Sequence, residues 1–398
     1  PILGNLQLSQ DKMSVGAEGG NFSVDIITDY EYAIDINVDW IEVTGGSCST
    51  EYCTLDFYVA KNISASARNG IITVFCNDYN LMATLTVSQE AGSEMPNNEI
   101  WYTSSNGKII EPYATNVFGA NIVSNTYENG QGVITFDGDV TQIGDKAFYA
   151  NDSNIDGGHR LTSITMPHSV TAIGDQAFTY CPLTSIYIPE GVTKIGLLAF
   201  GACDSLTNLD IANGITHIGE RAFISCMSLT SVTIPESVSH IGERAFVNCS
   251  SLKAFHGKYA SKDSRCLIVD GVLNSFAPAG VTEYSIPEGI EKIGFNAFMN
   301  TPQSNDSPLE KVTIPDSVTQ MGGSAFYGCN NLTYVYCKPI VPPTVDKIGE
   351  MFAKCSSRLI IYVHATSVGA YKTIEGWKEY ASNILYYFTT RKTATGSC

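Results

Sequence analysis

The chain has 398 residues and a formal net charge of −17, because 40 acidic side chains outnumber 23 basic ones. This balance excludes the positive surface that nucleic-acid binding needs, and it argues against docking on anionic lipid. Charged residues make up 16% of the sequence, whereas glycine and tyrosine are plentiful, a composition typical of β-rich exported proteins. No apolar run is long enough for a membrane-spanning helix, so we expect no such segment.

Residues 6–91 contain short runs in which apolar and polar residues alternate, separated by Gly, Asn, Asp and Ser turns. The clearest runs begin at Phe22, Tyr32, Leu55, Gly70 and Ala83. Five to seven short strands at about ten-residue spacing predict an antiparallel β-sandwich. Cys48 and Cys53 bracket a polar turn in this segment, and they either pair as a disulfide or remain thiols.

Four short motifs mark the same segment: Gly19-Gly20, Asp39-Trp40-Ile41, Asn62 with Arg68-Asn-Gly70, and the closing Leu85-Thr-Val-Ser-Gln89. Together they resemble the BACON module of exported Bacteroidetes proteins. The resemblance implies an Ig-like sandwich in residues 1–92 of a secreted or surface protein, and carbohydrate binding is suspected for that family. Trp40 is the candidate sugar platform, but a sandwich core also wants a tryptophan there, and we favour the core position.

Residues 93–132 begin with a linker that is rich in turn-forming and polar residues. Two runs that look like strands follow it, Ile100-Trp-Tyr-Thr-Ser and Ala120-Asn-Ile-Val-Ser-Asn-Thr-Tyr. We expect them to close the exposed first unit of the next domain, as its N-terminal cap.

Residues 133–388 contain a repeat of about 23 residues. One copy runs from Leu161 to Cys181, and the next copies begin after steps of 22, 23 and 23 residues. Counting Ile-Gly-x-x-Ala-Phe and its close variants gives eight units. In each unit, apolar residues at offsets 3 and 5 flank a polar residue, which predicts a short half-buried strand that ends at a proline. A second extended piece leads to the glycine at offset 13, which we expect to supply a turn.

No single unit can bury its own apolar residues, whereas stacked units can. The repeat therefore predicts a solenoid with one continuous core and strands about 4.7 to 4.9 Å apart. The pattern Leu-x-x-Ile-x-Ile-Pro-x-x-Val-x-x-Ile-Gly-x-x-Ala-Phe-x-x-Cys resembles the BspA-type leucine-rich repeat of bacterial surface proteins. The predicted fold class is mainly β, an Ig-like sandwich followed by a leucine-rich-repeat solenoid with short parallel strands.

Two segments depart from the repeat. Phe246 and Phe298 are 52 residues apart where two units would take 46, and Asp270-Gly271 lies between apolar runs, so we predict an enlarged unit with an added hairpin. The last unit, which ends at Phe352, is one residue short, and the aromatic segment after it resembles the family's C-terminal cap. Residues 389–398 are a polar tail, in which Cys398 is either a free thiol or foreign to the native chain.

Known catalytic motifs are absent from the sequence, which has no Gly-x-Ser-x-Gly, His-Glu-x-x-His, Walker loop or Cys-x-x-Cys. Ser324, which follows two glycines, is the nearest candidate for a catalytic nucleophile. Its segment is, however, an ordinary part of the repeat and gives no sign of catalysis. Because the chain has six histidines, a catalytic pair of a base and a nucleophile is still possible, although no sequence motif indicates one. We expect no enzyme and no cofactor.

Two patterns raise the question of a metal. His217 and His240 share one offset in consecutive units, so a surface Zn or Ni site competes with a solvated polar row, which we favour because other units hold Ala, Lys or Gln there. Residues 152–157 mimic the start of a calcium loop, but Ser163 stands where calcium wants a glutamate, which favours a polar insertion. We expect no metal.

Half of the 12 cysteines lie three residues after a repeat phenylalanine. Side chains stacked about 4.8 Å apart do not suit the Cβ separation of about 3.8 Å that a disulfide prefers. We therefore expect buried thiols that behave as small apolar residues, at Cys181, Cys203, Cys226, Cys249, Cys329 and Cys355.

The outward position of each repeat strand is the candidate binding surface. Side chains in register on parallel strands would form an extended, concave, polar and weakly aromatic sheet, the kind of surface that solenoids use for recognition. A solvated face without a ligand would look similar, so that alternative stays open. The candidate residues are Thr165, Tyr187, Asp210, Thr233, Ser285, Thr313, Tyr336 and Tyr334.

The sequence predicts a non-enzymatic binding protein, secreted or at the cell surface or outer membrane, whose partner is a host or bacterial surface protein or a glycan. The expectation that the protein acts in adhesion rests on the family resemblance alone. We expect a monomer, and because the sequence begins at Pro1, a removed N-terminal segment with a lipid anchor would fit. A carbohydrate-binding protein of a polysaccharide-utilisation system and a passive surface spacer are the alternatives.

Overall fold

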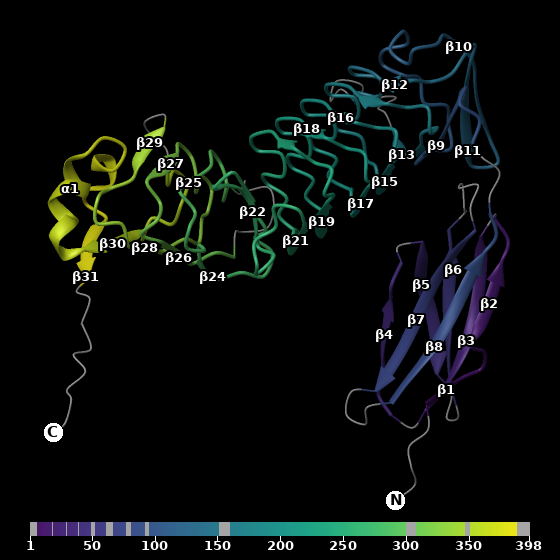
Figure 1. Cartoon of the computed structure of the whole chain (residues 1–398), viewed down its shortest axis with the longest axis horizontal. Helices are drawn as coiled ribbons and strands as arrows, with labels where there is room; N and C mark the ends of the chain where they lie inside the picture. Colours follow the sequence, from purple (N-terminus) through teal and green to yellow (C-terminus); the bar gives the residue numbers. More distant parts are fainter. Residues whose placement is uncertain are drawn as a thin grey trace, which may run out of the picture. The chain divides into compact units, whose positions relative to one another are not determined.

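The computed structural model describes residues 6–17, 19–28, 30–38, 40–48, 52–60, 67–76, 81–91, 95–150, 160–299, 308–346 and 351–387. The chain divides into two compact units, Pro1–Pro96 and Asn97–Cys398 (Figure 1). Each unit has a hydrophobic core of its own, so each is described by itself.

The N-terminal unit is a sandwich of two four-stranded sheets, with strand orders β1-β3-β6-β5 and β2-β8-β7-β4. The strands are β1 (Leu6–Leu8), β2 (Lys12–Val15), β3 (Gly20–Thr28), β4 (Ala33–Ile36), β5 (Ile41–Cys48), β6 (Cys53–Val59), β7 (Arg68–Cys76) and β8 (Leu81–Gln89). The expectation of five to seven antiparallel strands was wrong in two respects, since eight strands are present and β2 pairs parallel to β8. The strands β1 and β2 have only three and four residues, too few for a clear alternation.

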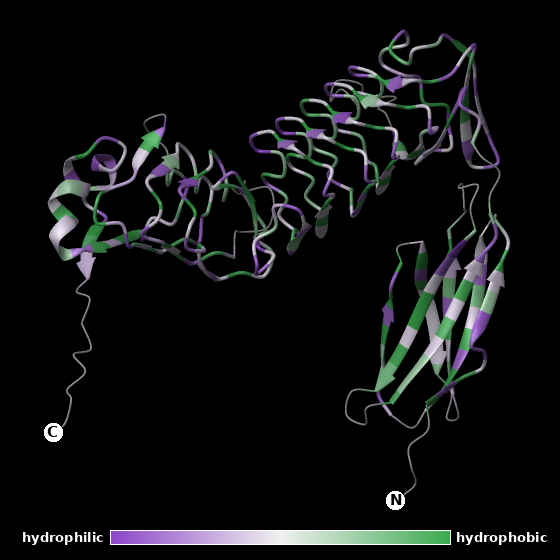
Figure 2. Cartoon of the chain, viewed as in Figure 1, coloured by the Kyte–Doolittle hydropathy of each residue, from purple (hydrophilic) through white to green (hydrophobic). Residues whose placement is uncertain are grey.

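Alternate residues of the long strands fill the space between the two sheets, and Figure 2 shows this alternation of hydrophobic and hydrophilic residues along them. Val24, Phe57, Ile72 and Leu85 are buried in this core. Trp40 packs against the same core and is partly buried, as expected, and the Arg68 guanidinium lies 4.4 Å from its ring centroid.

The motif residues at the end of the sandwich form a buried polar network. The Gln89 side chain is buried, and its amide donates to backbone carbonyl oxygens, including that of Ala60 at 2.9 Å. Its side-chain oxygen accepts from Arg68 Nε at 2.8 Å, and Arg68 also donates to Ala60 O at 2.9 Å. Gln89 and Arg68 therefore have a structural role, because their side chains pair with each other and with backbone carbonyls at the end of the sandwich.

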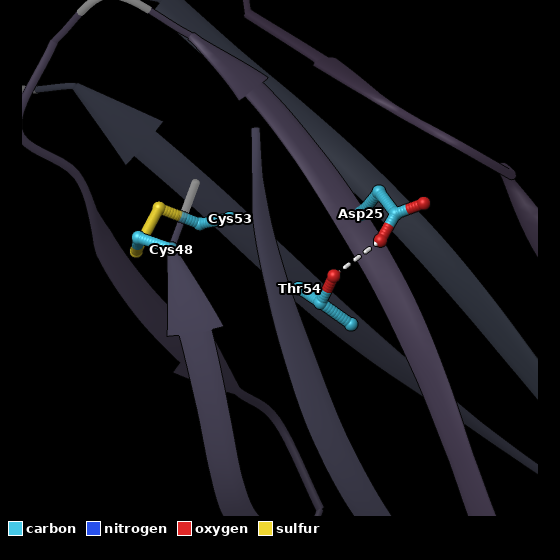
Figure 3. Close-up of a disulfide and its surroundings, with 4 residues drawn as sticks. All are labelled: Asp25, Cys48, Cys53 and Thr54. Carbon is cyan, nitrogen blue, oxygen red and sulfur yellow. Dashed lines mark hydrogen bonds between the residues drawn. A yellow bond between two sulfur atoms is a disulfide. The ribbon is translucent and has the colours of Figure 1, made fainter. Parts of the chain in front are cut away.

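The two cysteines of the sandwich form a disulfide. Cys48 ends β5 and faces Cys53 at the start of the antiparallel neighbour β6, with their Cα atoms 4.0 Å apart. Figure 3 shows this disulfide beside the hydrogen bond that Thr54 donates to the Asp25 carboxylate, at 2.6 Å. Of the two alternatives left open by the sequence, the structure shows the disulfide.

The second unit is a solenoid whose parallel strands form two rows, on opposite sides of the stack in Figure 1. In the first half the short row is β12 (Gln142–Ile143), β14 (Ala172–Ile173), β16 (Lys194–Ile195), β18 (His217–Ile218) and β20 (His240–Ile241). The long row is β13 (Leu161–Thr165), β15 (Ser185–Ile188), β17 (Asn208–Ile211), β19 (Ser231–Ile234) and β21 (Ala254–Gly257). The predicted fold class, mainly β with a solenoid of short parallel strands, is confirmed.

The repeat phenylalanines form an aromatic column inside the solenoid. The rings of Phe178, Phe200, Phe223 and Phe246 stack nearly parallel, with neighbouring centroids 5.0, 5.0 and 5.1 Å apart. All four rings are buried. Each unit thus buries its largest apolar group against the same group of the next unit, as the repeat pattern requires.

The repeat cysteines are free thiols that also donate hydrogen bonds. Cys181 Sγ donates to Phe148 O at 2.9 Å, and Cys249 Sγ donates to Phe223 O at 3.3 Å. The same contact recurs at the other members of the set, each to the phenylalanine of the preceding unit. The prediction of buried thiols is confirmed except that Cys355 is only partly buried. Burial raises the pKa of Cys249 to about 12, so this thiol stays protonated at neutral pH.

The repeat glycine has a different role from the one expected. A Cβ atom on Gly219 would lie 2.5 Å from the carbonyl carbon and oxygen of Gly196 in the preceding unit, so glycine is required by the close approach of two backbones. The left-handed turn falls two residues later, on ordinary residues such as Leu198 (φ 55°) and Arg221 (φ 54°). In this conformation Arg221 N donates to Glu243 O of the next unit at 3.0 Å.

The enlarged unit contains the predicted hairpin. The strands β22 (Cys266–Val269) and β23 (Val272–Phe276) are antiparallel, and the two residues between them, Asp270 and Gly271, have φ of 49° and 77°. Positive φ at both positions is the geometry of a type I′ turn, so this prediction is confirmed.

The hairpin starts a new pair of sheets. The short row continues as β25 (Lys292–Ile293), β27 (Gln320–Gly322) and β29 (Thr344–Asp346), and the long row as β24 (Glu283–Ser285), β26 (Lys311–Ile314), β28 (Tyr334–Cys337), β30 (Ile360–His364) and β31 (Ile384–Tyr387). The expectation of one continuous core was wrong, because the buried residues form two clusters. The column breaks where Phe246 meets the edge of Phe255, at an interplanar angle of 73°.

Different elements cover the two ends of the solenoid. At the N-terminal end β9 (Glu99–Ser104), β10 (Ile122–Glu128) and β11 (Gln131–Phe136) form an antiparallel sheet with β13. At the C-terminal end η2 (Ala365–Ser367), α1 (Val368–Thr373) and η3 (Lys378–Tyr380) precede β31. The buried Tyr371 and Trp377 donate to the carbonyls of Pro339 and Pro343, at 2.9 and 2.8 Å. The last repeat motif lies partly outside the described residues, but Phe352 stacks on Phe326.

Candidate functional site

The predicted binding residues lie on the outward side of the long row, because burial alternates along each strand. In β15, for example, Ile186 and Ile188 are buried, whereas Tyr187 is 41% exposed. Parallel pairing places Tyr187 beside Asp210 of β17. Partial burial raises the pKa of Tyr187, and the carboxylates of Asp210 and Glu190 add to this effect.

The structure groups these residues into four stretches rather than one ladder. Thr165 pairs with Trp101 of the N-terminal cap, and Tyr187 pairs with Asp210. Thr233 pairs with His256 of β21, after which the enlarged unit interrupts the row. The fourth stretch contains Ser285, Thr313, Tyr336 and then Tyr362 on four adjacent strands.

The fourth stretch carries an aromatic cluster. The ring centroids of Tyr336 and Tyr362 are 5.0 Å apart with an interplanar angle of 18°, and Tyr334 lies 6.4 Å from Tyr362. We call these three residues the tyrosine cluster. Tyr334 is 39% exposed, and the neighbouring Leu385 of β31, in register with Tyr362, is 46% exposed. This part of the face therefore combines flat rings with apolar surface that solvent can reach.

A cation borders the tyrosine cluster. Lys311 Nζ lies 5.5 Å from the ring centroid of Tyr336 and 3.0 Å from a carboxylate oxygen of Glu283. The hydrogen bond to Glu283 raises the pKa of Lys311, so the ammonium remains charged at neutral pH. The cluster thus presents aromatic faces beside a fixed pair of opposite charges.

Two residues of this surface, Tyr362 and His256, were missed by the sequence analysis. Tyr362 follows its partner Tyr336 by more than one repeat length, so a search at constant spacing passes over it. The alternation of Leu359, Ile361 and Val363, all buried, was the available signal for its strand. His256 lies in the enlarged unit, where the repeat pattern stops.

The other candidates of the sequence analysis do not converge on a site. The imidazole rings of His217 and His240 are 5.7 Å apart and tilted, and the described residues contain no group of three His, Cys, Asp or Glu side chains able to hold a metal. The calcium-like residues 152–157 lie outside the described residues. Ser324 lies at a corner between strands, with φ of 56°, like the equivalent residues of other units.

A family model matches more than half of the chain. The model for the BspA type leucine rich repeat region matches residues 120–253 and 273–372, in six copies. The chain belongs to the BspA-type leucine-rich repeat family. Members of this family are surface or secreted bacterial proteins, and leucine-rich repeat proteins mediate binding to other proteins. The unmatched stretch between the two ranges is the segment that contains the start of the hairpin.

Several solved structures are similar to this BspA-type chain. A leucine-rich repeat protein from Bacteroides ovatus is 24% identical with a TM-score of 0.40, over 62% of this chain and 57% of that protein. A leucine rich cell surface protein from Faecalibacterium prausnitzii is 23% identical with a TM-score of 0.38, over 60% and 80% of the two chains. The pneumococcal vaccine antigen PcpA is 14% identical with a TM-score of 0.38, over 67% and 86%. A search of curated proteins gives no match.

The chain thus spans little more than half the length of the Bacteroides ovatus protein that it matches. Among the described residues, no helix has the length and apolar character needed to cross a membrane.

Proposed function

We propose that this protein is a non-enzymatic binding protein, secreted or at the cell surface, that recognises a host or bacterial surface protein through the outward face of the long row. The observation that supports this most is the tyrosine cluster. Tyrosine is enriched at protein interfaces because it offers a large flat apolar area with a polar end, at a small cost in side-chain entropy. Here three such rings lie together on a rigid sheet beside Lys311.

The proposal extends to the organisation of the chain. Residues 1–92 are proposed as a BACON module, 93–132 as the linker and N-terminal cap, 133–388 as the solenoid with its C-terminal cap, and 389–398 as a tail. The Cys48–Cys53 disulfide supports export, because disulfides persist in oxidising compartments. A monomer attached to the outer membrane through a lipid on a preceding segment remains part of this proposal.

Glycan binding by the sandwich is the second candidate, and the structure gives it less support. The guanidinium of Arg68 lies over the Trp40 ring, where a sugar would stack. The tyrosine cluster is a second aromatic surface, on which Tyr334 is 39% exposed. The test below therefore includes glycans as well as proteins.

The experiment compares the intact chain with two variants. Tyr336→Ala combined with Tyr362→Ala removes the stacked pair, and Tyr180→Ala removes an exposed tyrosine at a corner outside the long row. Each protein is assayed by surface plasmon resonance against purified extracellular-matrix proteins and bacterial surface proteins, and on a glycan array.

We expect the double variant to bind its protein partner at least about tenfold more weakly, because buried aromatic contacts dominate such interfaces, and Tyr180→Ala to bind normally. Equal melting temperatures would show that the fold is retained. Binding to glycans alone would favour the second candidate. Absence of binding to every probe, or full retention by the double variant, would contradict the proposal and favour a passive spacer.

A further inference from the structure

The break between the two halves of the solenoid leaves a half-open cavity of about 230 Å³. It lies on the side of the short row, where β20 ends the first sheet and the hairpin begins the second. Its lining includes His240, Glu243 and Arg244 from the first half. Asp270, Lys292 and Phe295 line it from the second half. The volume is below the roughly 300 to 1,000 Å³ of sites for drug-sized molecules, so the cavity suits a ligand of the size of one sugar or amino acid.

Arg244 is the unusual residue of this cavity. Its guanidinium carbon lies 3.9 Å from the ring centroid of Phe295, so the planar group is stacked on an aromatic face. The Nε atom is buried and has no hydrogen-bond partner among the described residues. Among the described residues, the backbone N–H of Arg244 and its two terminal nitrogens also have no hydrogen-bond or ion-pair partner.

The preceding unit shows what the same position does where the stack is complete. Arg221 occupies the equivalent offset, and its backbone N donates to Glu243 O of the next unit at 3.0 Å. Its side chain forms an ion pair with Glu220 at 3.4 Å. At Arg244 the next unit is displaced by the hairpin, so the backbone contact to a following unit is lost. The carboxylates of Glu220 and Glu243 act on Arg244 electrostatically, but its side chain forms no hydrogen bond or ion pair with them.

We propose that this cavity binds a small ligand through its carboxylate, which the two terminal nitrogens of Arg244 would hold. A guanidinium presents paired N–H groups in a fixed plane that matches the two oxygens of a carboxylate. Because Nε is covered, the fork formed by the two Nη atoms is the one that faces the ligand. Stacking on Phe295 fixes the plane of that fork before the ligand arrives, which lowers the entropic cost of binding.

The remaining side chains indicate what else the ligand carries. Glu243 and Asp270 line the cavity and accept hydrogen bonds, so the ligand needs donors near its carboxylate. Lys292 is already paired with Asp346, at 2.5 Å, and therefore leaves Arg244 as the cation for the ligand. Hydroxyl groups of a uronic acid and the ammonium group of a free amino acid both meet this need, and the experiment separates the two sources.

The test uses ligand-observed NMR and calorimetry on the intact chain with matched probes. Galacturonate is compared with galactose, and serine is compared with ethanolamine, since each second member lacks the carboxylate. Arg244→Gln removes the charge, whereas Arg244→Lys keeps the charge without the planar fork. Arg221→Gln, at the equivalent position of the preceding unit and outside the cavity, is the control.

We expect one of the two carboxylate probes to bind, with its matched compound and both Arg244 variants weaker by at least about tenfold and the Arg221 variant unchanged. The probe that binds identifies the source. Binding of neither acid, equal binding of an acid and its match, or an equal loss in the Arg221 variant would overturn the proposal. The tyrosine cluster is on the other row, so this result is independent of the assay on surface proteins.

Discussion

At the scale of single residues, the solenoid depends on positions where one unit meets the backbone of the next. The repeat glycine leaves room for a neighbouring carbonyl, and the repeat cysteine donates to one. The left-handed residues at each corner, such as Leu198 and Arg221, turn their N–H groups toward the next unit. The left-handed conformation is unfavourable for residues that carry a side chain. It persists at these corners because the inter-unit hydrogen bonds require it.

The role of the repeat glycine gives a prediction. Gly219→Ala places a Cβ 2.5 Å from the backbone of Gly196, so we expect the free energy of unfolding of the solenoid to fall by about 3 kcal/mol. The measurement is denaturant unfolding followed by circular dichroism. Gly369→Ala is the control, because Gly369 is in α1 with open space around it, and alanine there should be neutral or slightly stabilising. Equal stability of the Gly219 variant and the native chain would show that the two backbones can separate at little cost.

At the scale of elements, the hairpins of the chain are held in different ways. The β22–β23 hairpin depends on two residues with positive φ, whereas the β5–β6 hairpin is tied by the Cys48–Cys53 disulfide. The disulfide stabilises the sandwich by lowering the conformational entropy of the unfolded chain, since it restricts the segment between the two cysteines.

We therefore expect the variant Cys48→Ser with Cys53→Ser to unfold its sandwich with a free energy lower by about 2 kcal/mol, the amount estimated for closing so short a loop. Chemical denaturation of chains that carry Trp101→Phe and Trp377→Phe, followed by the fluorescence of the remaining Trp40 in the sandwich, would report this. A reducing agent should give the same shift in the native chain and none in the variant. A reductant effect that persists in the double variant would assign the change to another cause.

The sequence predicted the parts of the fold that the repeat itself encodes. The period of 23 residues identifies which side chains face the core, and the phenylalanine column and the buried thiols follow from that. It could not locate Tyr362 or the cavity at Arg244, because both arise where the spacing between units changes. A period describes what equivalent residues share, whereas a break depends on the particular contacts of the residues on either side.

At the scale of the whole molecule, the sandwich core has no residues in common with either of the two core clusters of the solenoid. Phe57 is buried in the sandwich core, and Phe223 is buried in the first cluster of the solenoid. The sandwich and the solenoid are therefore expected to unfold as separate cooperative transitions.

Differential scanning calorimetry tests this expectation. Phe57→Ala should lower the temperature of one transition and Phe223→Ala that of another, each through a loss of about 3 to 5 kcal/mol from the cavity that the missing ring leaves. The transition that responds to Phe57→Ala should also be the one that responds to reductant. A joint shift of all transitions in either variant would mean that the two units unfold together.

The inter-unit hydrogen bonds have a consequence for how such a chain can change in length. A corner N–H donates to the following unit, as Arg221 N does to Glu243 O, whereas Gly219 N donates to Ile195 O and the Cys249 thiol to Phe223 O, both in the preceding unit. A duplicated or deleted unit therefore preserves all these contacts only if it is whole, while a partial one leaves donors facing the wrong atoms. Evolution or a designer can thus lengthen the outward face of the long row in increments of about 4.8 Å, one duplication at a time, without redesigning either terminus.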